Sequence, residues 1–259
     1  VWSMNTVYDF VKNDNWVSIP SFISAVGGTR TVSPDGNYAI HTFTASGPFS
    51  VTAAFGKPTA ISSADYLVVA GGASGGKGNA AGAGGGGAGG LRVSPGTASG
   101  CWTASPLGAS PAVALPVLAQ GYSIAIGAGG AGTPCGGNNG DTGSVSTFAT
   151  ITSAGGGRGS GSDVPGAGAG AGGSGGGGMP IEAPGRPAGA GNTPPVSPAQ
   201  GNPGGTGTPS AGGGYPSGGG GGATASGQNG GPGNCNTGGA GGAGAQVNIC
   251  GNSYFWSGG

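Results

Sequence analysis

The sequence predicts a mainly β protein with almost no α-helix, in which a small β-sandwich-like domain precedes a layered bundle of polyglycine-II helices. Three observations support this prediction. Short runs of β-branched and aromatic residues recur in the first half of the chain. Of the 259 residues 70 are glycine, and long glycine runs dominate the segment from Ala154 to Gly244. Charge is scarce, with 7 basic and 7 acidic residues and a net charge of zero.

The glycine runs lack the side chains that an ordinary core needs. A polyproline-II helix has three residues per turn and rises about 3.1 Å per residue, and only glycine fits where such helices crowd together. Fixing one backbone residue costs about 1–2 kcal/mol, whereas a hydrogen bond returns about 0.5–1.5 kcal/mol. A lone run therefore stays unfolded, but a bundle whose runs exchange lateral backbone hydrogen bonds can order.

Disorder is the main alternative for this half, because 70 glycines together with 20 prolines are typical of low-complexity chains. The scarcity of charge argues against it, since disordered chains usually carry high net charge. The Gly/Ala alternation from Gly166 to Gly172 suits a silk-like stacked sheet but is too short to define a fold. No Gly-X-Y period supports collagen.

Three parts are predicted along the chain: residues 1–20 as a helical attachment segment, 21–153 as a β-rich domain, and 154–259 as the glycine-rich domain with a closing hairpin. In the first part, Met4, Val7, Tyr8 and Val11 follow a helical spacing from 3 to 13. A packed helix and an exposed docking segment both fit this pattern.

The β-rich part contains several short predicted strands. Residues 38–43 and 49–54 are expected to pair as a hairpin, after a turn at 34–36. Residues 65–70 are apolar after Asp65, which indicates a strand buried on both faces. Strands are also predicted at 91–93, 113–115, 122–126 and 148–151, and a closing strand and hairpin at 246–250 and 254–256. This spacing is typical of a sandwich.

Four cysteines, Cys101, Cys135, Cys235 and Cys250, allow three pairings. Two disulfides and four free thiols both fit the sequence, and Cys235 with Cys250 is the favoured pair because the two flank the last glycine run. No CxxC motif occurs, and His41 is the one histidine, so we expect no zinc site and no other metal site.

Two glycine motifs resemble nucleotide-binding loops. Gly71–Gly78 nearly matches a P-loop, but Gly78 replaces the magnesium-binding Ser/Thr, and Gly127–Gly132 matches GxGxxG. Neither is followed by a helix-forming segment. His41 lies in a predicted strand, where packing is its ordinary role, and the carboxylates are scattered. We therefore expect no enzyme activity and no cofactor.

Partner classes are also limited by composition. Without a basic excess we expect no nucleic-acid binding, and no apolar run approaches the roughly 20 residues of a membrane span. The interruptions between glycine runs are either plain turns or recognition loops held on a rigid scaffold. The candidate receptor-binding residues there are Met179, Ile181, Glu182, Arg186, Pro195, Val196, Tyr215, Asn234 and Asn236.

Several segments together resemble the glycine-rich domain of tailed-phage structural proteins. They are Tyr38–Thr44 with Ser46–Val51, Asp65–Gly72, Gly84–Arg92, Tyr122–Gly130, Asn139–Ser144 and Val247–Trp256. The N-terminal Trp2–Tyr8 with Trp16 is similar to leader segments of virion appendage proteins. The resemblance covers most of the chain, although the β-rich part and the four cysteines depart from the tip adhesins of T-even-type phages.

The resemblance implies a non-enzymatic virion appendage or fibre protein, located on the virion or extracellularly. Its loops are then expected to bind a host surface polysaccharide or an outer-membrane protein. The alternative is a subunit that self-assembles into an extracellular filament, or decorates a capsid or tail, without binding a receptor. Either role implies other virion or fibre subunits as partners and a homo-oligomer. The candidate assembly residues are Trp2, Met4, Val7, Tyr8, Val11, Trp16, Tyr254, Phe255 and Trp256.

Overall fold

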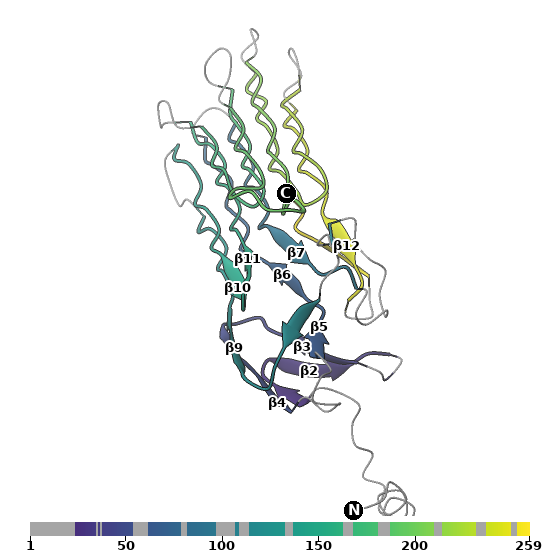
Figure 1. The fold of residues 1–259 in the computed structure, drawn as a ribbon. Helices are drawn as coiled ribbons and strands as arrows, with labels where there is room; N and C mark the ends of the chain where they lie inside the picture. The colour runs from purple at the N-terminus through teal and green to yellow at the C-terminus, as the bar shows by residue number, and fades with distance from the viewer. Residues whose placement is uncertain are drawn as a thin grey trace, which may run out of the picture.

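The chain folds into short β-strands at one end and long glycine-rich segments at the other (Figure 1). The computed structural model describes residues 24–34, 36, 38–53, 62–78, 82–96, 107–108, 114–132, 137–162, 168–180, 187–209, 214–231, 237–249 and 253–259. Within these ranges the regular elements are strands, which confirms the prediction of a mainly β chain. The predicted helix at 3–13 lies outside the described residues.

The largest sheet is antiparallel and has five strands, in the order β1-β4-β9-β10-β11. Its strands are β1 (Ser24–Val26), β4 (Gly47–Ala53), β9 (Gly121–Ala125), β10 (Ser146–Phe148) and β11 (Ile151–Ser153). Four two-stranded antiparallel sheets complete the strand end. They pair β2 (Thr29–Val32) with β3 (Ala39–Thr42), β5 (Ser62–Ala64) with β8 (Leu115–Val117), β6 (Leu67–Val69) with β7 (Leu91–Val93), and β12 (Ala245–Val247) with β13 (Tyr254–Trp256).

The predicted hairpin between residues 38–43 and 49–54 is wrong. The turn predicted at 34–36 does form, since the Gly36 N–H donates to the Ser33 carbonyl at 2.9 Å, but it joins β3 to the preceding strand β2. Strand β4 instead pairs with β1 and with the distant β9. The predicted pairing failed because β2 is a better local partner for β3, being joined to it by a tight turn.

The predicted strand at 148–151 is also wrong in its bounds, because the chain reverses inside it. Ala149 has a positive φ of 51°, and the turn at 149–150 separates β10 from β11. The two strands pair in register, with Phe148 opposite Ile151. The predicted closing hairpin is confirmed by the β12–β13 pair.

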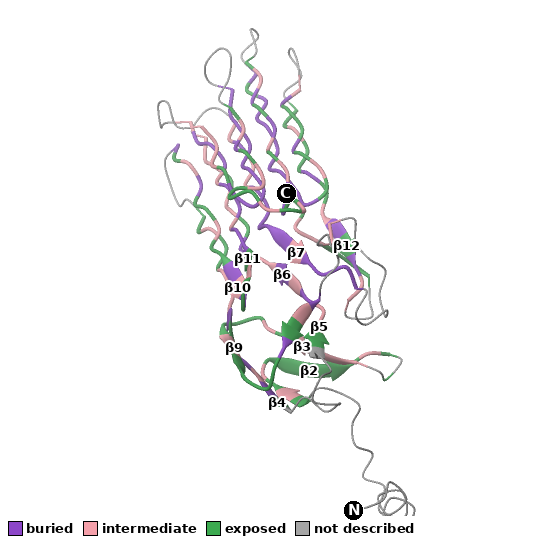
Figure 2. Ribbon diagram, in the orientation of Figure 1, coloured by how far each residue is buried: buried purple, intermediate pink, exposed green. Residues whose placement is uncertain are grey.

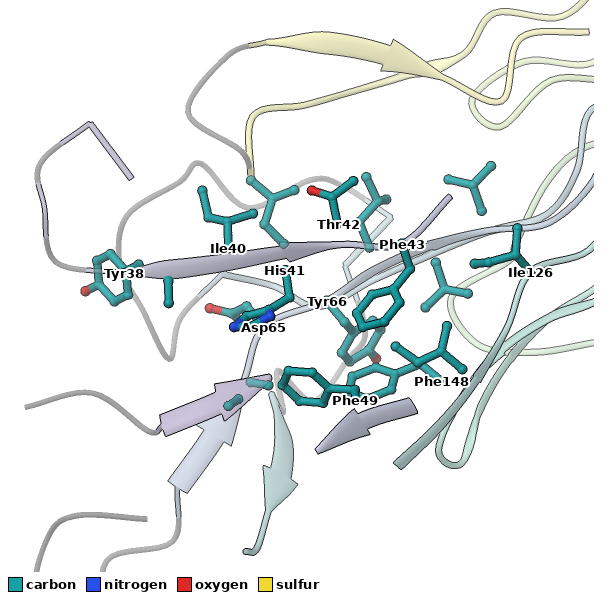
Figure 3. Close-up of a pocket in the computed structure, with 18 of the residues that line it drawn as sticks. Tyr38, Ile40, His41, Thr42, Phe43, Phe49, Asp65, Tyr66, Ile126 and Phe148 are labelled. Carbon is teal, nitrogen blue, oxygen red and sulfur yellow. The ribbon is translucent and has the colours of Figure 1, made fainter. Parts of the chain in front are cut away.

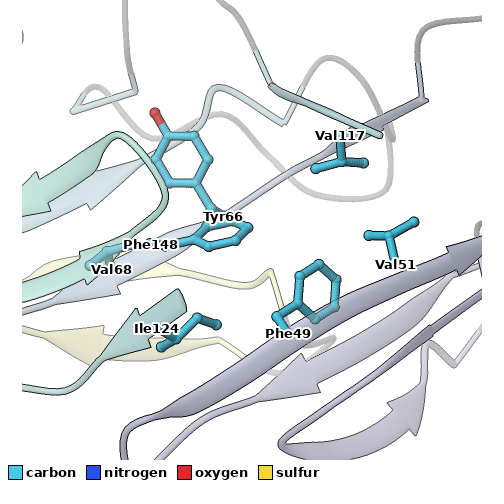
Figure 4. Packing of buried hydrophobic residues seen from close by; sticks show 7 residues of the cluster. All are labelled: Phe49, Val51, Tyr66, Val68, Val117, Ile124 and Phe148. Atoms are coloured by element: carbon cyan, nitrogen blue, oxygen red, sulfur yellow. The ribbon is translucent and has the colours of Figure 1, made fainter. Parts of the chain in front are cut away.

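Two apolar cores lie on either side of β6. One contains Phe49, Val51, Tyr66, Val68, Val117, Ile124 and Phe148 (Figure 4). The other contains Leu91, Val93, Ala223, Ala245 and Val247. Tyr66 and Val68 belong to the first, whereas Leu67 and Val69 pack against the second. Because alternate residues of a strand point to opposite faces, the apolar run at 65–70 serves both cores, as predicted.

The glycine-rich part consists of straight segments that run side by side (Figure 1). We call each of these segments a rod. In the described residues the rods are 71–78, 82–90, 127–132, 137–144, 154–162, 168–172, 174–180, 187–191, 201–209, 214–222, 226–231 and 237–244. They lack the hydrogen bonding of helices or strands, and the innermost are buried (Figure 2).

Hydrogen bonds between rods repeat every three residues. The N–H groups of Ala70, Ala73 and Gly76 donate in turn to the carbonyls of Gly90, Gly87 and Gly84. The next row of the same rod turns to another neighbour: Gly71, Ser74 and Lys77 donate to Ser144, Asp141 and Asn138. A three-residue repeat is that of a polyproline-II helix. Each rod therefore turns successive amides toward different neighbours, as expected for polyglycine II.

The 174–180 rod lies at the centre of this lattice. Every N–H and every C=O from Ser174 to Gly178 forms a backbone hydrogen bond, with donor–acceptor distances between 2.7 and 3.1 Å. These bonds reach six surrounding rods, which are 82–90, 154–162, 168–172, 187–191, 201–209 and 214–222. At its centre the lattice thus satisfies its buried backbone without an apolar core.

The lattice extends beyond the predicted glycine-rich domain at 154–259. Gly84, Gly87 and Gly90 donate to the 154–162 rod, while Gly85 and Ala88 donate to the 214–222 rod. Residues 71–78, 82–90, 127–132 and 137–144 therefore belong to the same bundle as the later rods. The chain leaves the strands, runs along the lattice and returns, so strands and rods alternate in sequence but separate in space.

Candidate functional site

The ends of the rods farthest from the strands form the first candidate site. Rods that are distant in sequence end together there, since Lys77 donates to the Asn138 carbonyl at 2.9 Å and Ser162 donates to the Lys77 carbonyl at 3.1 Å. Farther along the chain, the Thr208 N–H donates to the carbonyl of Pro216 at 3.0 Å. These bonds place the side chains near the rod ends on one rigid face.

Polar side chains at this end bind neighbouring backbone. The Thr208 Oγ1 donates to the Gly230 carbonyl at 2.8 Å, and the Asn229 Oδ1 accepts from the Thr206 N–H at 2.8 Å. On the earlier rods, Asn139 Oδ1 accepts from the Gly161 N–H at 2.8 Å. Side chains thus replace rod-to-rod amide bonds where the lattice ends.

The predicted receptor-binding residues do not form one surface. Tyr215 lies at the far rod ends and is 43% exposed. Met179 is fully buried with Pro180 at the end of the central rod, so its side chain is not offered to a partner. The predicted residues Ile181, Glu182, Arg186, Asn234 and Asn236 lie outside the described residues, as do Cys101, Cys135, Cys235 and Cys250.

Pro195 and Val196 lie at the opposite end of the rods, next to the strands. The backbone of Asn192 is in the left-handed region, with φ 49°. Its side-chain amide donates to the Val196 carbonyl and accepts from the Val196 N–H, both at 3.1 Å. Gln200 is buried, and its amide accepts from the Ala154 N–H and donates to the Pro194 carbonyl, both at 2.8 Å. This segment, which contains cis peptides before Pro194 and Pro198, is tied into the base of the lattice.

Of the predicted assembly residues, Trp2, Met4, Val7, Tyr8, Val11 and Trp16 lie outside the described residues. Tyr254 and Phe255 on β13 are exposed, Phe255 by 73%. Trp256 is half-buried, and its ring meets the Tyr254 ring edge-on at a centroid distance of 6.2 Å. An exposed aromatic strand of this kind is a candidate contact surface.

A cavity of about 560 Å³ beneath the rods is a second candidate site. Figure 3 shows the rings of Phe43, Phe49, Tyr66 and Phe148 gathered in it, with His41 and Asp65 at the same wall. Most of the lining is apolar. Such a cavity can bury an apolar group.

Three polar groups at this cavity, which belong to His41, Asp65 and the Tyr66 backbone, have structural partners. His41 Nδ1 lies 2.8 Å from the Gly27 carbonyl, so this nitrogen carries the proton. Ser94 Oγ donates to Asp65 Oδ1 at 2.7 Å and accepts from the Tyr66 N–H at 3.0 Å. Burial raises the pKa of the Tyr66 hydroxyl; the positive charge of Arg92 opposes this shift, and the Asp65 carboxylate adds to it.

The two nucleotide-loop motifs are rods of the lattice. The amides of Gly71, Ala73, Ser74, Gly76 and Lys77 all donate to neighbouring backbone, so they do not cradle a phosphate. In the 127–132 segment, the Gly130 N–H likewise donates to the Gly72 carbonyl. No group of His, Cys, Asp and Glu side chains able to hold a metal occurs within the described ranges. Among those residues there is also no helix that could span a membrane.

Sequence reasoning missed the buried role of Met179 and the separation of Pro195 and Val196 from Tyr215. Both follow from the direction in which each rod runs, which no local residue pattern indicates. A family model described as a glycine-rich domain matches residues 44–259. No curated protein and no solved structure gave a match. With five-sixths of its length matched in this way, the chain belongs to the glycine-rich domain family.

Proposed function

We propose that this chain is a non-enzymatic appendage or fibre protein of a tailed phage that binds a host cell surface through the segments between its rods. The observation that carries the proposal is the lattice itself. Its central rod is hydrogen-bonded to six neighbours, so the rods form a stiff block whose ends on one side lie away from the strands. Recognition residues usually lie on loops that a rigid scaffold positions.

The scarcity of charge in the rods, whose charged residues in the described part of the chain are Lys77, Asp141 and Arg158, supports the same role. Because the backbone groups are used within the lattice, specificity must come from the residues that join consecutive rods. Residues 181–186 carry an Ile, a Glu and an Arg between the 174–180 and 187–191 rods. Together with Tyr215 they offer apolar, charged and aromatic contacts, which suit a polysaccharide or an outer-membrane protein.

The experiment is a binding assay of the labelled chain to whole bacterial cells and to an array of bacterial surface polysaccharides. In the test variant, residues 181–186 are replaced by glycine and serine and Tyr215 by serine. The control variant carries Val196→Ser at the opposite rod ends. We expect the test variant to lose binding and the control to retain it. Equal binding by both variants, or no binding to any cell type, would refute the proposal.

A further inference from the structure

One side of the 154–162 rod faces no other rod. This rod bonds to five neighbours, which in order around it are 137–144, 71–78, 82–90, 174–180 and 168–172. Each neighbour also bonds to the next in this order, but among the described residues no hydrogen bond joins 168–172 back to 137–144. The gap between these two rods is therefore open along the 154–162 rod. We call this gap the lateral groove.

A row of backbone amides lines the floor of the lateral groove. Within the described part of the chain, the N–H groups of Gly155 and Arg158 form no hydrogen bond. The next amide of the same three-residue row, that of Gly161, donates to the Asn139 Oδ1 at 2.8 Å. The chain thus shows what this row binds, which is an oxygen acceptor. Two further donors of the same row, about 9 Å apart, are half-buried and unused.

The side chain of Arg158 lies in the lateral groove as an unpaired cation. A Cβ built on Gly170 would lie 2.9 Å from the Arg158 Cγ, so the stem of the side chain runs against the 168–172 rod. Its Nε is buried without a hydrogen-bond partner, and no ion pair with a described residue neutralises the guanidinium. Asp141, the one carboxylate on the described rods, instead has both backbone groups bonded to Ser74 on the 71–78 rod. A partly buried charge without a partner is unfavourable, so an anion that reaches it gains binding energy.

These groups define the chemistry of the occupant. A guanidinium matches the geometry of a carboxylate, and the two amides require further oxygen acceptors. Thr142 follows Asn139 by three residues on the same wall and is exposed, which adds a hydroxyl. Nucleic acids and anionic membranes are bound by several basic residues together, whereas the described groove has one. A chain of sugars fits better, because its acidic groups are accompanied by many neutral oxygens.

We propose that the lateral groove binds an acidic polysaccharide. A carboxylate of the sugar chain accepts from the Arg158 guanidinium, and neighbouring sugar oxygens accept from the N–H groups of Arg158 and Gly155. The Thr142 hydroxyl lies on the wall as a further contact. This inference goes beyond the proposed host binding and does not depend on it, because the groove is on the side of a rod and uses none of the residues that join rods.

The test uses the full chain and a short fluorescent oligogalacturonate, an acidic sugar chain. The control is the same sugar chain with its carboxylates converted to methyl esters, which removes the charge and keeps the sugar oxygens. We expect fluorescence anisotropy to rise with the acid form alone. Arg158→Gln should weaken this binding by about tenfold or more, since it removes a charge-assisted hydrogen bond. Arg30→Gln removes the same charge from an exposed position on β2 and should bind like the parent chain. Equal binding of acid and ester, or unchanged binding by Arg158→Gln, would overturn the proposal.

A second measurement locates the site without any substitution. In NMR spectra the acid sugar should shift the amide signal of Gly155, whose N–H is free, and leave that of Gly157, whose N–H donates to the Ser174 carbonyl at 2.8 Å. An unchanged Gly155 signal would overturn the proposal. So would a single-stranded oligonucleotide that binds more tightly than the acid sugar, because the groove would then be a nucleic-acid site. The variant with altered segment 181–186 and Tyr215 keeps the lateral groove and should bind the acid sugar like the parent chain, so the two proposals can fail separately.

Discussion

Adjacent glycines of one rod should respond in opposite ways to the same substitution. A Cβ on Gly71 would overlap the carbonyl oxygen of Ala128 on the neighbouring rod. A Cβ on Gly72 would lie 3.8 Å from the nearest atom, the Gly89 nitrogen, which is an ordinary contact. Gly72→Ala is therefore a matched control for Gly71→Ala, with the same change in the unfolded chain.

The expected magnitudes follow from these contacts. Gly72→Ala should stabilise the protein by about 0.5 kcal/mol, because alanine has less conformational freedom when unfolded. Gly71→Ala must push two backbones apart, which strains two hydrogen bonds, from Gly71 to the Ser144 carbonyl and from Gly156 to the Gly71 carbonyl. Overpacking costs about 1–3 kcal/mol, and one hydrogen bond left unmade adds about 1–3 kcal/mol. We expect a loss of about 3 kcal/mol.

The assay is urea unfolding of both variants and the parent chain, followed by tryptophan fluorescence. The free energies of unfolding of the two variants should differ by more than about 2 kcal/mol, with opposite signs relative to the parent. If Gly71→Ala is as stable as Gly72→Ala, the rods do not approach as closely as described, and the account of the lattice is wrong.

Three further predictions concern other parts of the molecule. Amide exchange should be slowest from Gly175 to Gly178, where every N–H is hydrogen-bonded, and fast at Gly129 and Gly132 on the exposed 127–132 rod. Equal exchange rates measured by NMR would contradict the central position of the 174–180 rod. Ser94→Ala should lower the free energy of unfolding by about 2 kcal/mol, since it removes hydrogen bonds to Asp65 and Tyr66. Ser160→Ala removes one 3.3 Å contact, so it should lower the free energy of unfolding less in the same urea assay. The pKa of Tyr66 is raised in the folded protein, so the stability that the neutral Tyr66 hydroxyl contributes is complete below the unfolded tyrosine pKa of about 10 and is lost as pH rises through the folded pKa. Tyr66→Phe should therefore flatten the alkaline decline in the free energy of unfolding. An unchanged slope would contradict this prediction.

The repeat of the glycine runs was predictable from the sequence because it depends on the absence of side chains alone. The buried strand at 65–70 and the closing hairpin at β12–β13 were also predictable, because burial and local turns depend on residues that are close together in the sequence. The partner of β4 was not, because β9 lies about seventy residues later. The positive φ of Ala149 was also not predictable, because alanine is not among the residues that favour turns.

The candidate site was harder to predict than the fold. The direction of each rod decides whether an interruption lies beside the strands, as Pro195 does, or at the far ends, as Tyr215 does. That direction follows from counting the rods in order, and several begin inside the predicted β-rich domain. The burial of Met179 depends in turn on the central place of its rod, which only the assembled lattice reveals.

The three-residue repeat of the rods restricts how their lengths can change. Removing one residue from the 174–180 rod would rotate everything beyond it by a third of a turn, so each later amide would face the wrong neighbour. Removing or adding a whole triplet restores every pairing and shifts the rod end by about 9 Å. Length variation among related lattices should therefore occur in triplets within rods, whereas the residues joining rods are free to vary in any number.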